Sequence, residues 1–155
     1  MPITHTIRVD APRPTVWQHI EDPELQKAWM TGLLSNELIE GEKSQVGGKF
    51  KMVIKEGRKE QTYDGEITAH DEPNHLGVAF WGGHFKGVTR VTADYHLSED
   101  NGGTRLDYVC DFEGEMGFLM KLMMPLFMCF GKMQLKKMLK KLKENAEGGG
   151  TTAAA

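Results

Sequence analysis

The sequence predicts an α+β fold, in which an antiparallel sheet of about seven strands holds one long C-terminal helix. From Gly32 to Gly114, polar and apolar residues alternate with a period of two, which is typical of half-buried strands. Helical patterns precede and follow this region. A chain of 155 residues is long enough for one core, so we expect a single domain over residues 1–147 and a disordered tail over residues 148–155.

The first 29 residues are expected to form one strand and two short helices. Residues 3–9 alternate between apolar and polar side chains, as in a strand with one buried face. Residues 14–20 follow as a short helix. Asp22 and Pro23 then have the form of a helix N-cap and a first helical residue, so a second short helix should run to Trp29.

Six further strands are expected at residues 37–40, 49–56, 61–70, 75–81, 85–97 and 104–113. The segment from Asp100 to Gly103, with the sequence DNGG, is a strong hairpin signal between the last two strands. Alternation predicts inward-facing Phe50, Met52, Phe80, Tyr95, Leu106 and Tyr108, and outward-facing Lys51, Asp94 and Asp107. A slip of one residue would exchange these two sets, so the prediction is a sharp one.

Most ionisable strand residues are expected on the outer face of the sheet. They include Asp64, Glu66, His70, Arg90, Asp94 and His96. We interpret them as cross-strand surface groups, each pair contributing roughly 0.2–1 kcal/mol. Catalytic groups need burial and a cleft to tune them, so this face is not expected to carry an active site.

The closing helix is divided into an apolar half and a basic half. Seven of the ten methionines lie from Met116 to Met138, and residues 116–130 are almost all apolar. We expect this helix to begin near Gly117, to bend near Pro125, to end near residue 145 and to be buried against the sheet. Six lysines over residues 132–143 should face water. Alternatively, this basic helix is a membrane-surface or protein-interaction element.

Composition and motifs exclude several classes of protein. The net charge of −3 argues against nucleic-acid binding. The two cysteines, Cys110 and Cys129, show neither disulfide nor metal-ligand spacing, and the N-terminal residues lack a signal-peptide pattern, so we expect a cytoplasmic protein. The apolar run is too short for stable membrane insertion. No catalytic, phosphate-binding or metal motif occurs, so no metal and no cofactor are expected.

Three stretches of the sequence carry a family resemblance. They are VDAPRPTVWQHIEDPELQKAW from Val9, VGGKF from Val46 and GGTRLDYVCDFEG from Gly102. With the order of the elements, they resemble the helix-grip fold of the START/SRPBCC superfamily, and its polyketide cyclase/dehydrase and lipid-transport group above all. The resemblance covers nearly all of residues 3–145. It implies that the antiparallel sheet is curved and wraps around the long C-terminal helix, with a deep cavity between them. These motifs are structural, so the resemblance assigns no catalytic residue.

The expected function is binding or transport of a hydrophobic small molecule, such as a lipid, an isoprenoid quinone or a polyketide-like aromatic compound. The expected cavity-lining residues are His5, Trp29, Met52, Tyr63, Phe80, Trp81, Tyr95, Tyr108, Met120, Met124 and Met128. Alternatively, the protein is a cofactor-free cyclase/dehydrase-type enzyme in which His5, Tyr63 and Tyr108 move protons. Each group also has a plainer interpretation, which is a hydrogen-bonded core histidine for His5 and ordinary packing for the tryptophans.

Overall fold

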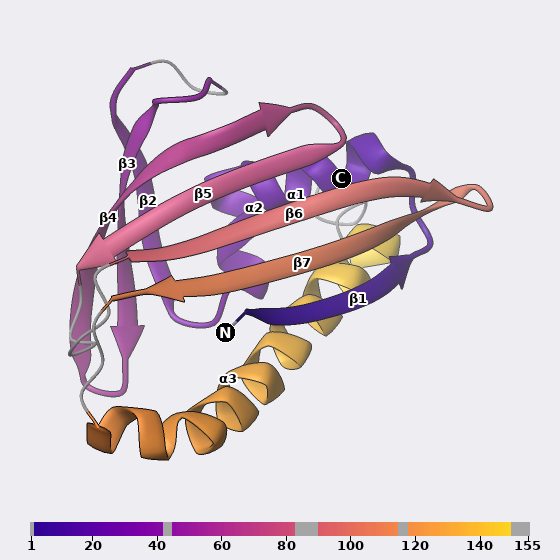
Figure 1. Ribbon diagram of the computed structural model, residues 1–155. Helices are drawn as coiled ribbons and strands as arrows, with labels where there is room; N and C mark the ends of the chain where they lie inside the picture. The colour runs from indigo at the N-terminus through magenta and orange to yellow at the C-terminus, as the bar shows by residue number, and fades with distance from the viewer. Residues whose placement is uncertain (1, 42–44, 83–89, 115–117, 150–155) are drawn as a thin grey trace.

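A computed structural model describes residues 2–41, 45–82, 90–114 and 118–149 of the chain. Its strands are β1 (Ile3–Val9), β2 (Leu33–Glu40), β3 (Lys49–Glu56), β4 (Lys59–Asp71), β5 (His75–Gly82), β6 (Arg90–Asp100) and β7 (Gly103–Glu113). Its helices are α1 (Arg13–Glu21), α2 (Pro23–Trp29), α3 (Phe118–Glu144) and the short π-helix η1 (Asn145–Gly149). The predicted helix-grip α+β fold is confirmed (Figure 1).

The seven strands form one antiparallel sheet with the order β1-β7-β6-β5-β4-β3-β2. Figure 1 shows that the sheet curves strongly, so that β2 and β3 run across the direction of β6 and β7. The helices α1, α2 and α3 lie on the concave side of this sheet. The curvature leaves one inner face that can enclose a cavity and one outer face open to water.

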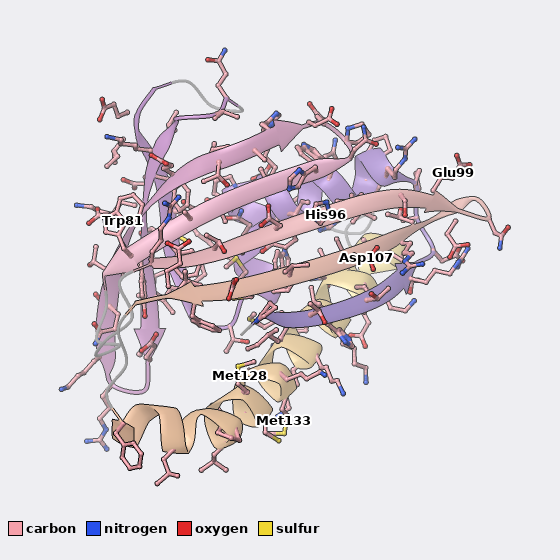
Figure 2. The ribbon with its side chains drawn as sticks, viewed as in Figure 1. Trp81, His96, Glu99, Asp107, Met128 and Met133 are labelled. Atoms are coloured by element: carbon pink, nitrogen blue, oxygen red, sulfur yellow. The ribbon has the colours of Figure 1, made fainter. Side chains whose placement is uncertain are left out.

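The facing predicted for nine named strand side chains is confirmed. Of the inward set, Phe50, Met52, Tyr95, Leu106 and Tyr108 are buried, and Phe80 is half-buried. Lys51, Asp94 and Asp107 alternate with these residues and lie on the opposite face, where Figure 2 shows Asp107. Two further details agree with the sequence. The β6–β7 turn places Asn101 and Gly102 at positive φ, as a two-residue hairpin turn of type I′ requires, and β3 has the predicted bounds.

Some element bounds differ from the prediction. Strand β2 starts at Leu33 rather than at residue 37, and its pairing with β3 is irregular at two points, which obscures the alternation in sequence. Part of the strand predicted over residues 85–97 lies outside the described residues, and the described part continues to Asp100. The first two residues of the predicted disordered tail belong to η1, and residues 150–155 lie outside the description.

The two short helices are fixed by local signals that the sequence shows. The carboxylate of Asp22 accepts a hydrogen bond of 2.9 Å from the backbone N–H of Glu24, and Pro23 is the first residue of α2. This is the predicted N-cap. Trp17 anchors α1 in the core, and its indole N–H donates to the carboxylate of Glu21 at 2.8 Å. The helices therefore carry Glu21 and the residues of α2 to one end of the sheet.

The second half of α3 packs as expected. Leu135, Leu139 and Leu142 are buried, at the helical spacing that the sequence shows. A Cβ at Gly131 would lie only 3.4 Å from Cδ1 of Ile3, so the helix approaches β1 closely there. The helix continues through Pro125 without a break, and Figure 1 shows it curving instead, so the proline bends the helix and does not end it.

The expectation that the apolar half of α3 is buried is wrong for most of the side chains that the structure describes there. Phe118, Leu122, Leu126, Phe130 and Met133 are between 48% and 82% exposed. Their spacing of three or four residues places them on one side of the helix, which faces away from the sheet, and Figure 2 shows Met133 on that side. Among the strands, α3 packs mainly against β1, so the sheet covers only the other side of the helix. We call these five residues the apolar stripe.

Candidate ligand-binding cavity

A cavity of about 470 Å³ lies between the inner face of the sheet and the helices α2 and α3. Its volume falls in the range of about 300–1,000 Å³ that is common for small-molecule sites. The apolar part of its wall is formed by Ile20, Trp29, Met30, Leu38, Phe50, Met52, Ile54, Ile67, Leu76, Val78, Phe80, Ala93, Leu135 and Met138. Every layer of the fold therefore contributes to one mostly apolar chamber.

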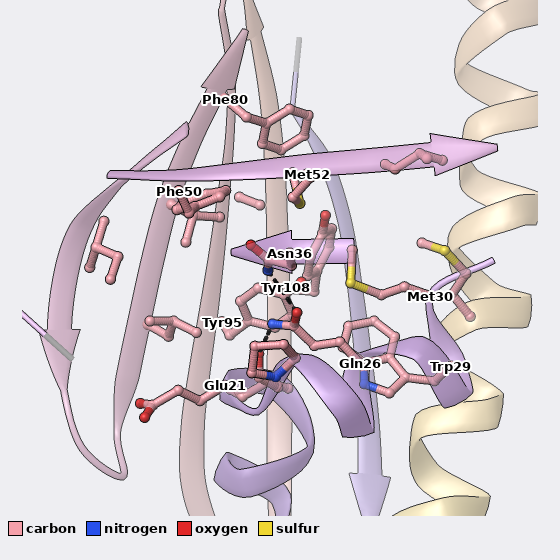
Figure 3. A pocket seen from close by; sticks show the side chains of 18 of the residues that line it. Glu21, Gln26, Trp29, Met30, Asn36, Phe50, Met52, Phe80, Tyr95 and Tyr108 are labelled. Atoms are coloured by element: carbon pink, nitrogen blue, oxygen red, sulfur yellow. Dashed lines mark hydrogen bonds between the residues drawn. The ribbon is translucent and has the colours of Figure 1, made fainter. Parts of the chain in front are cut away.

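One end of the cavity carries a hydrogen-bonded polar pair from α2 and β2. The amide of Asn36 donates to Oε1 of Gln26 at 2.8 Å, and Nε2 of Gln26 donates to the backbone carbonyl of Ile20 at 2.7 Å (Figure 3). Gln26 is buried and Asn36 is half-buried, and both line the cavity. Their hydrogen bonds hold both amides in fixed orientations, so they can recognise a polar group on a ligand.

A histidine–carboxylate pair lies in the same wall. Nε2 of His70 is 2.9 Å from Oε2 of Glu21, and the rings of His70 and Trp17 are perpendicular with centroids 5.2 Å apart. The His70 side chain is only 11% exposed. The same carboxylate oxygen accepts the indole N–H of Trp17, so Glu21 is held from two sides. Such a pair can hold or move a proton at the cavity wall.

Two tyrosines from neighbouring strands also line the cavity. Tyr95 and Tyr108 are paired across β6 and β7, and their rings meet edge to face at 5.0 Å. Burial is the main cause that raises the pKa of each hydroxyl well above its ordinary value. Burial also raises the pKa of the neighbouring Cys110 thiol to about 11. These three groups therefore stay neutral near pH 7 and present hydroxyl and thiol dipoles rather than charges.

Of the eleven residues predicted to line a cavity, Trp29, Met52, Phe80, Tyr95 and Tyr108 do so. Figure 3 shows Phe80 and Met52 toward one end and Gln26 and Glu21 toward the other, with the tyrosines and Asn36, which is paired with Met52 across β2 and β3, between them. The side chains of Met120 and Met124 lie outside the described part of the structure. Of the three residues predicted to move protons in an enzyme, only Tyr108 is among the lining residues.

Four other predicted residues lie elsewhere, each for a local reason. The Tyr63 ring packs against Phe80 at 6.0 Å, and its hydroxyl donates to Glu56 at 2.9 Å, away from the cavity. Trp81 follows Phe80 and therefore points to the outer face (Figure 2). Met128 packs against the main core. His5 is half-buried. Its imidazole pKa is lowered mainly by burial and, to a smaller extent, by the positive charges of nearby lysines on α3.

The sequence analysis did not identify the polar residues that line the cavity, and His70 is the clearest case. Alternation along β4 places His70 outward, but β4 contains a bulge: Ile67 pairs with Val78 and Ala69 with Gly77. The extra residue reverses the facing of the residues after it, which turns His70 into the cavity. Gln26 could have been found, since it lies three residues before Trp29 and so shares its helix face.

Comparison with known families agrees with this architecture. Residues 2–147 match the family described as polyketide cyclase / dehydrase and lipid transport. The chain belongs to this family. Membership accounts for the helix-grip fold and for the hydrophobic cavity, and it confirms the resemblance seen in the sequence. None of the curated proteins compared matches the chain.

Solved structures share the fold of this family member at low sequence identity. Ara h 8.0201 has a TM-score of 0.74 at 16% identity, with 94% of this chain and 97% of that chain covered. TTHA0849 from Thermus thermophilus has a TM-score of 0.73 at 18% identity, and the same shares of the two chains are covered. Aha1 from Colwellia psychrerythraea, solved as a dimer, has a TM-score of 0.68 at 15% identity, with 96% of this chain and 98% of that chain covered. These similarities establish the fold alone. Among the helices of the described residues, none is long and apolar enough to cross a bilayer.

Proposed function

We propose that this protein binds and carries one hydrophobic small molecule that has a polar end, such as a lipid, an isoprenoid quinone or a polyketide-like aromatic compound. The observation that carries the proposal is the cavity of about 470 Å³ with an apolar wall and one polar end. Burial of apolar ligand surface supplies the affinity, at about 25 cal/mol per Å² before the costs of association. The two free cysteines suit a cytoplasmic carrier.

The polar end sets the orientation of the ligand. A carbonyl or hydroxyl group near Gln26, Asn36 and His70 would find hydrogen-bonding partners, whereas the rest of the wall offers aromatic and aliphatic contacts. A ligand that enters with the opposite orientation would bury its polar group without a partner, which costs about 1–3 kcal/mol. The cavity therefore favours amphipathic molecules over pure hydrocarbons of the same size.

A substitution that places a larger side chain in the cavity tests the proposal. Ala93 is buried on β6 and lines the cavity, so the ring in Ala93→Phe would occupy ligand space. We expect the affinity for the apolar fluorescent probe N-phenylnaphthylamine to fall at least about tenfold, which is about 1.4 kcal/mol. Because the ring enters a void, the protein should not show the loss of about 1–3 kcal/mol that overpacking of a filled core causes.

The matched control is Thr92→Phe, which adds a ring to the adjacent residue on the opposite face of β6. This variant should bind the probe as the parent does. Equal loss of binding in both variants, or strong destabilisation by Ala93→Phe with unchanged binding, would contradict a ligand cavity. Native mass spectrometry of the protein from its source, with extraction of bound lipid, then identifies the ligand.

A second function is favoured by the apolar stripe on α3: docking on an anionic membrane surface. An α-helix completes five turns in about 18 residues, so Lys136 and Lys140 lie in line with Phe118 and Leu122. Lys132, Lys136, Lys137, Lys140 and Lys141 are all exposed. Apolar side chains that enter the acyl boundary, beside lysines that contribute about 1 kcal/mol each near anionic headgroups, are typical of interfacial helices.

The lysines also lie beside the ligand cavity. Lys137, Lys140 and Lys141 border a second hollow whose wall includes Thr31, and Thr31 also lines the cavity. A bilayer that contacts α3 would therefore meet the protein close to the rim of the cavity. This arrangement suits a carrier that takes its ligand from a membrane and returns it there.

Vesicle co-sedimentation tests the docking surface. The double variant Leu122→Glu/Leu126→Glu should lose most binding to phosphatidylcholine vesicles that contain phosphatidylserine, because it places charge in the stripe. Ile39→Glu is the control, since Ile39 is also exposed but lies on β2. Binding by the parent should weaken in high salt and on vesicles of phosphatidylcholine alone. If the parent protein does not bind anionic vesicles at low salt, membrane docking through α3 is contradicted.

A further inference from the structure

Three side chains that can bind metal ions lie together on the outer face of the sheet. His75 lies on β5, and Asp94 and His96 lie on β6 (His96 is labelled in Figure 2). One ligand atom from each of the three lies within 4.8 Å of the others. We propose that this cluster binds a divalent transition-metal ion, Zn²⁺ in the first instance. The site is independent of the ligand cavity and of the stripe on α3.

Strand pairing brings the cluster together. His75 is paired with His96 across β5 and β6, and their rings stack at a centroid distance of 4.1 Å. Asp94 precedes His96 by two residues, so both side chains leave β6 on the same face. His75 and His96 are 21 residues apart in the chain. No local spacing reveals such a cross-strand site, which explains why the sequence predicts no metal.

A glycine makes room for the carboxylate. Gly77 is paired with Asp94, and a Cβ there would lie 2.7 Å from Oδ1 of Asp94 and 2.8 Å from Oγ1 of Thr68. Without that Cβ, the carboxylate lies over β5 and reaches His75, whose Nε2 is 2.8 Å from Oδ1. The backbone therefore already holds the carboxylate and one imidazole close enough to bind the same ion.

The donor set suits zinc. Two imidazoles and one carboxylate are ligands that zinc and its first-row neighbours prefer, and three protein ligands leave a position open to water. A tetrahedral site with bonds of about 2.1 Å holds its ligand atoms about 3.4 Å apart. The three side chains are all partly or largely exposed, so rotation about their own bonds can close the remaining distance without movement of the strands.

The carboxylate that β7 places beside His96 is held by other partners. Asp107 is paired with His96 on the other side, but its carboxylate accepts hydrogen bonds from Thr6 at 2.5 Å and from Arg105 at 3.1 Å. It is therefore held in place by other partners. Tyr95 lies between the two ligands of β6 and points into the cavity. The ion would therefore lie on the outer face of strands whose inner face lines the cavity.

Isothermal titration with zinc chloride tests the site on protein that carries no histidine tag. We expect saturable binding of one ion, weakened by His75→Ala, His96→Ala and Asp94→Asn. Loss of an outer-shell partner alone typically lowers metal affinity about 10–100-fold, so loss of one of three direct ligands should cost at least about tenfold. Glu99→Gln, which neutralises a nearby exposed carboxylate of β6, should bind zinc as the parent does.

Nuclear magnetic resonance of the imidazoles in the parent protein gives a second test that needs no variant. Zinc should shift the side-chain signals of His75 and His96 and leave those of His19 and His70 unchanged. Absence of saturable binding would overturn the proposal. Binding that none of the three substitutions weakens, or shifts confined to other histidines, would overturn it as well.

Discussion

Leu139→Ala is expected to lower the free energy of unfolding by about 2–5 kcal/mol. Leu139 is fully buried on the half of α3 that packs into the core, between Leu135 and Leu142 on the same side of the helix. Truncation removes apolar contacts and leaves a void that the closely packed surroundings fill only in part. Urea denaturation followed by circular dichroism measures the loss, which is a large part of the stability of about 5–15 kcal/mol of a typical domain.

The matched control is Leu126→Ala on the same helix. Leu126 belongs to the exposed stripe, so the same substitution should change the free energy of unfolding by no more than about 0.5 kcal/mol. A loss of more than about 2 kcal/mol at Leu126 would mean that the stripe is buried in solution, for example against a second copy of the chain. A small loss at Leu139 would instead contradict the packing of α3 on the sheet.

Strand facing could be predicted from the sequence because the period of a strand is fixed by its geometry. Phe50, Tyr95 and Tyr108 follow that period and lie where alternation places them. His70 does not, because one extra residue in β4 reverses the facing beyond Ile67. The bulge has no compositional mark in this chain, since Thr68 and Ala69 are ordinary strand residues. The apolar wall of the cavity was thus more predictable than its polar end.

The helix α3 shows a different limit. Periodicity located the side that packs, through Leu135 and Leu142, and the basic half was recognised by its lysines. Composition alone also predicted burial for the apolar half, yet a helix has two sides and β1 covers only one of them. How far a sheet extends along a helix depends on tertiary geometry that a one-dimensional pattern does not contain. The apolar stripe therefore became visible only in the structure.

Trp29→Ala is expected to lower the free energy of unfolding by about 3–5 kcal/mol and to change ligand binding at the same time. Trp29 is 2% exposed, lines the cavity, and meets Tyr95 edge to face at 6.4 Å. Its indole N–H donates to the backbone carbonyl of His19 at 2.7 Å, which ties α2 to α1. Truncation would remove this link and open the cavity wall. Urea denaturation and N-phenylnaphthylamine titration measure the two effects.

Trp29→Phe separates the ring from the hydrogen bond. Phenylalanine keeps an aromatic wall but leaves the carbonyl of His19 without its donor, which costs about 1–3 kcal/mol when such a group stays buried. We therefore expect an intermediate stability and an affinity for the probe closer to the parent than to Trp29→Ala. Equal losses of stability in both variants would assign the role of Trp29 to the hydrogen bond between the helices. Unchanged probe affinity in Trp29→Ala would show that the ligand does not contact this wall, and the binding site would then have to lie elsewhere.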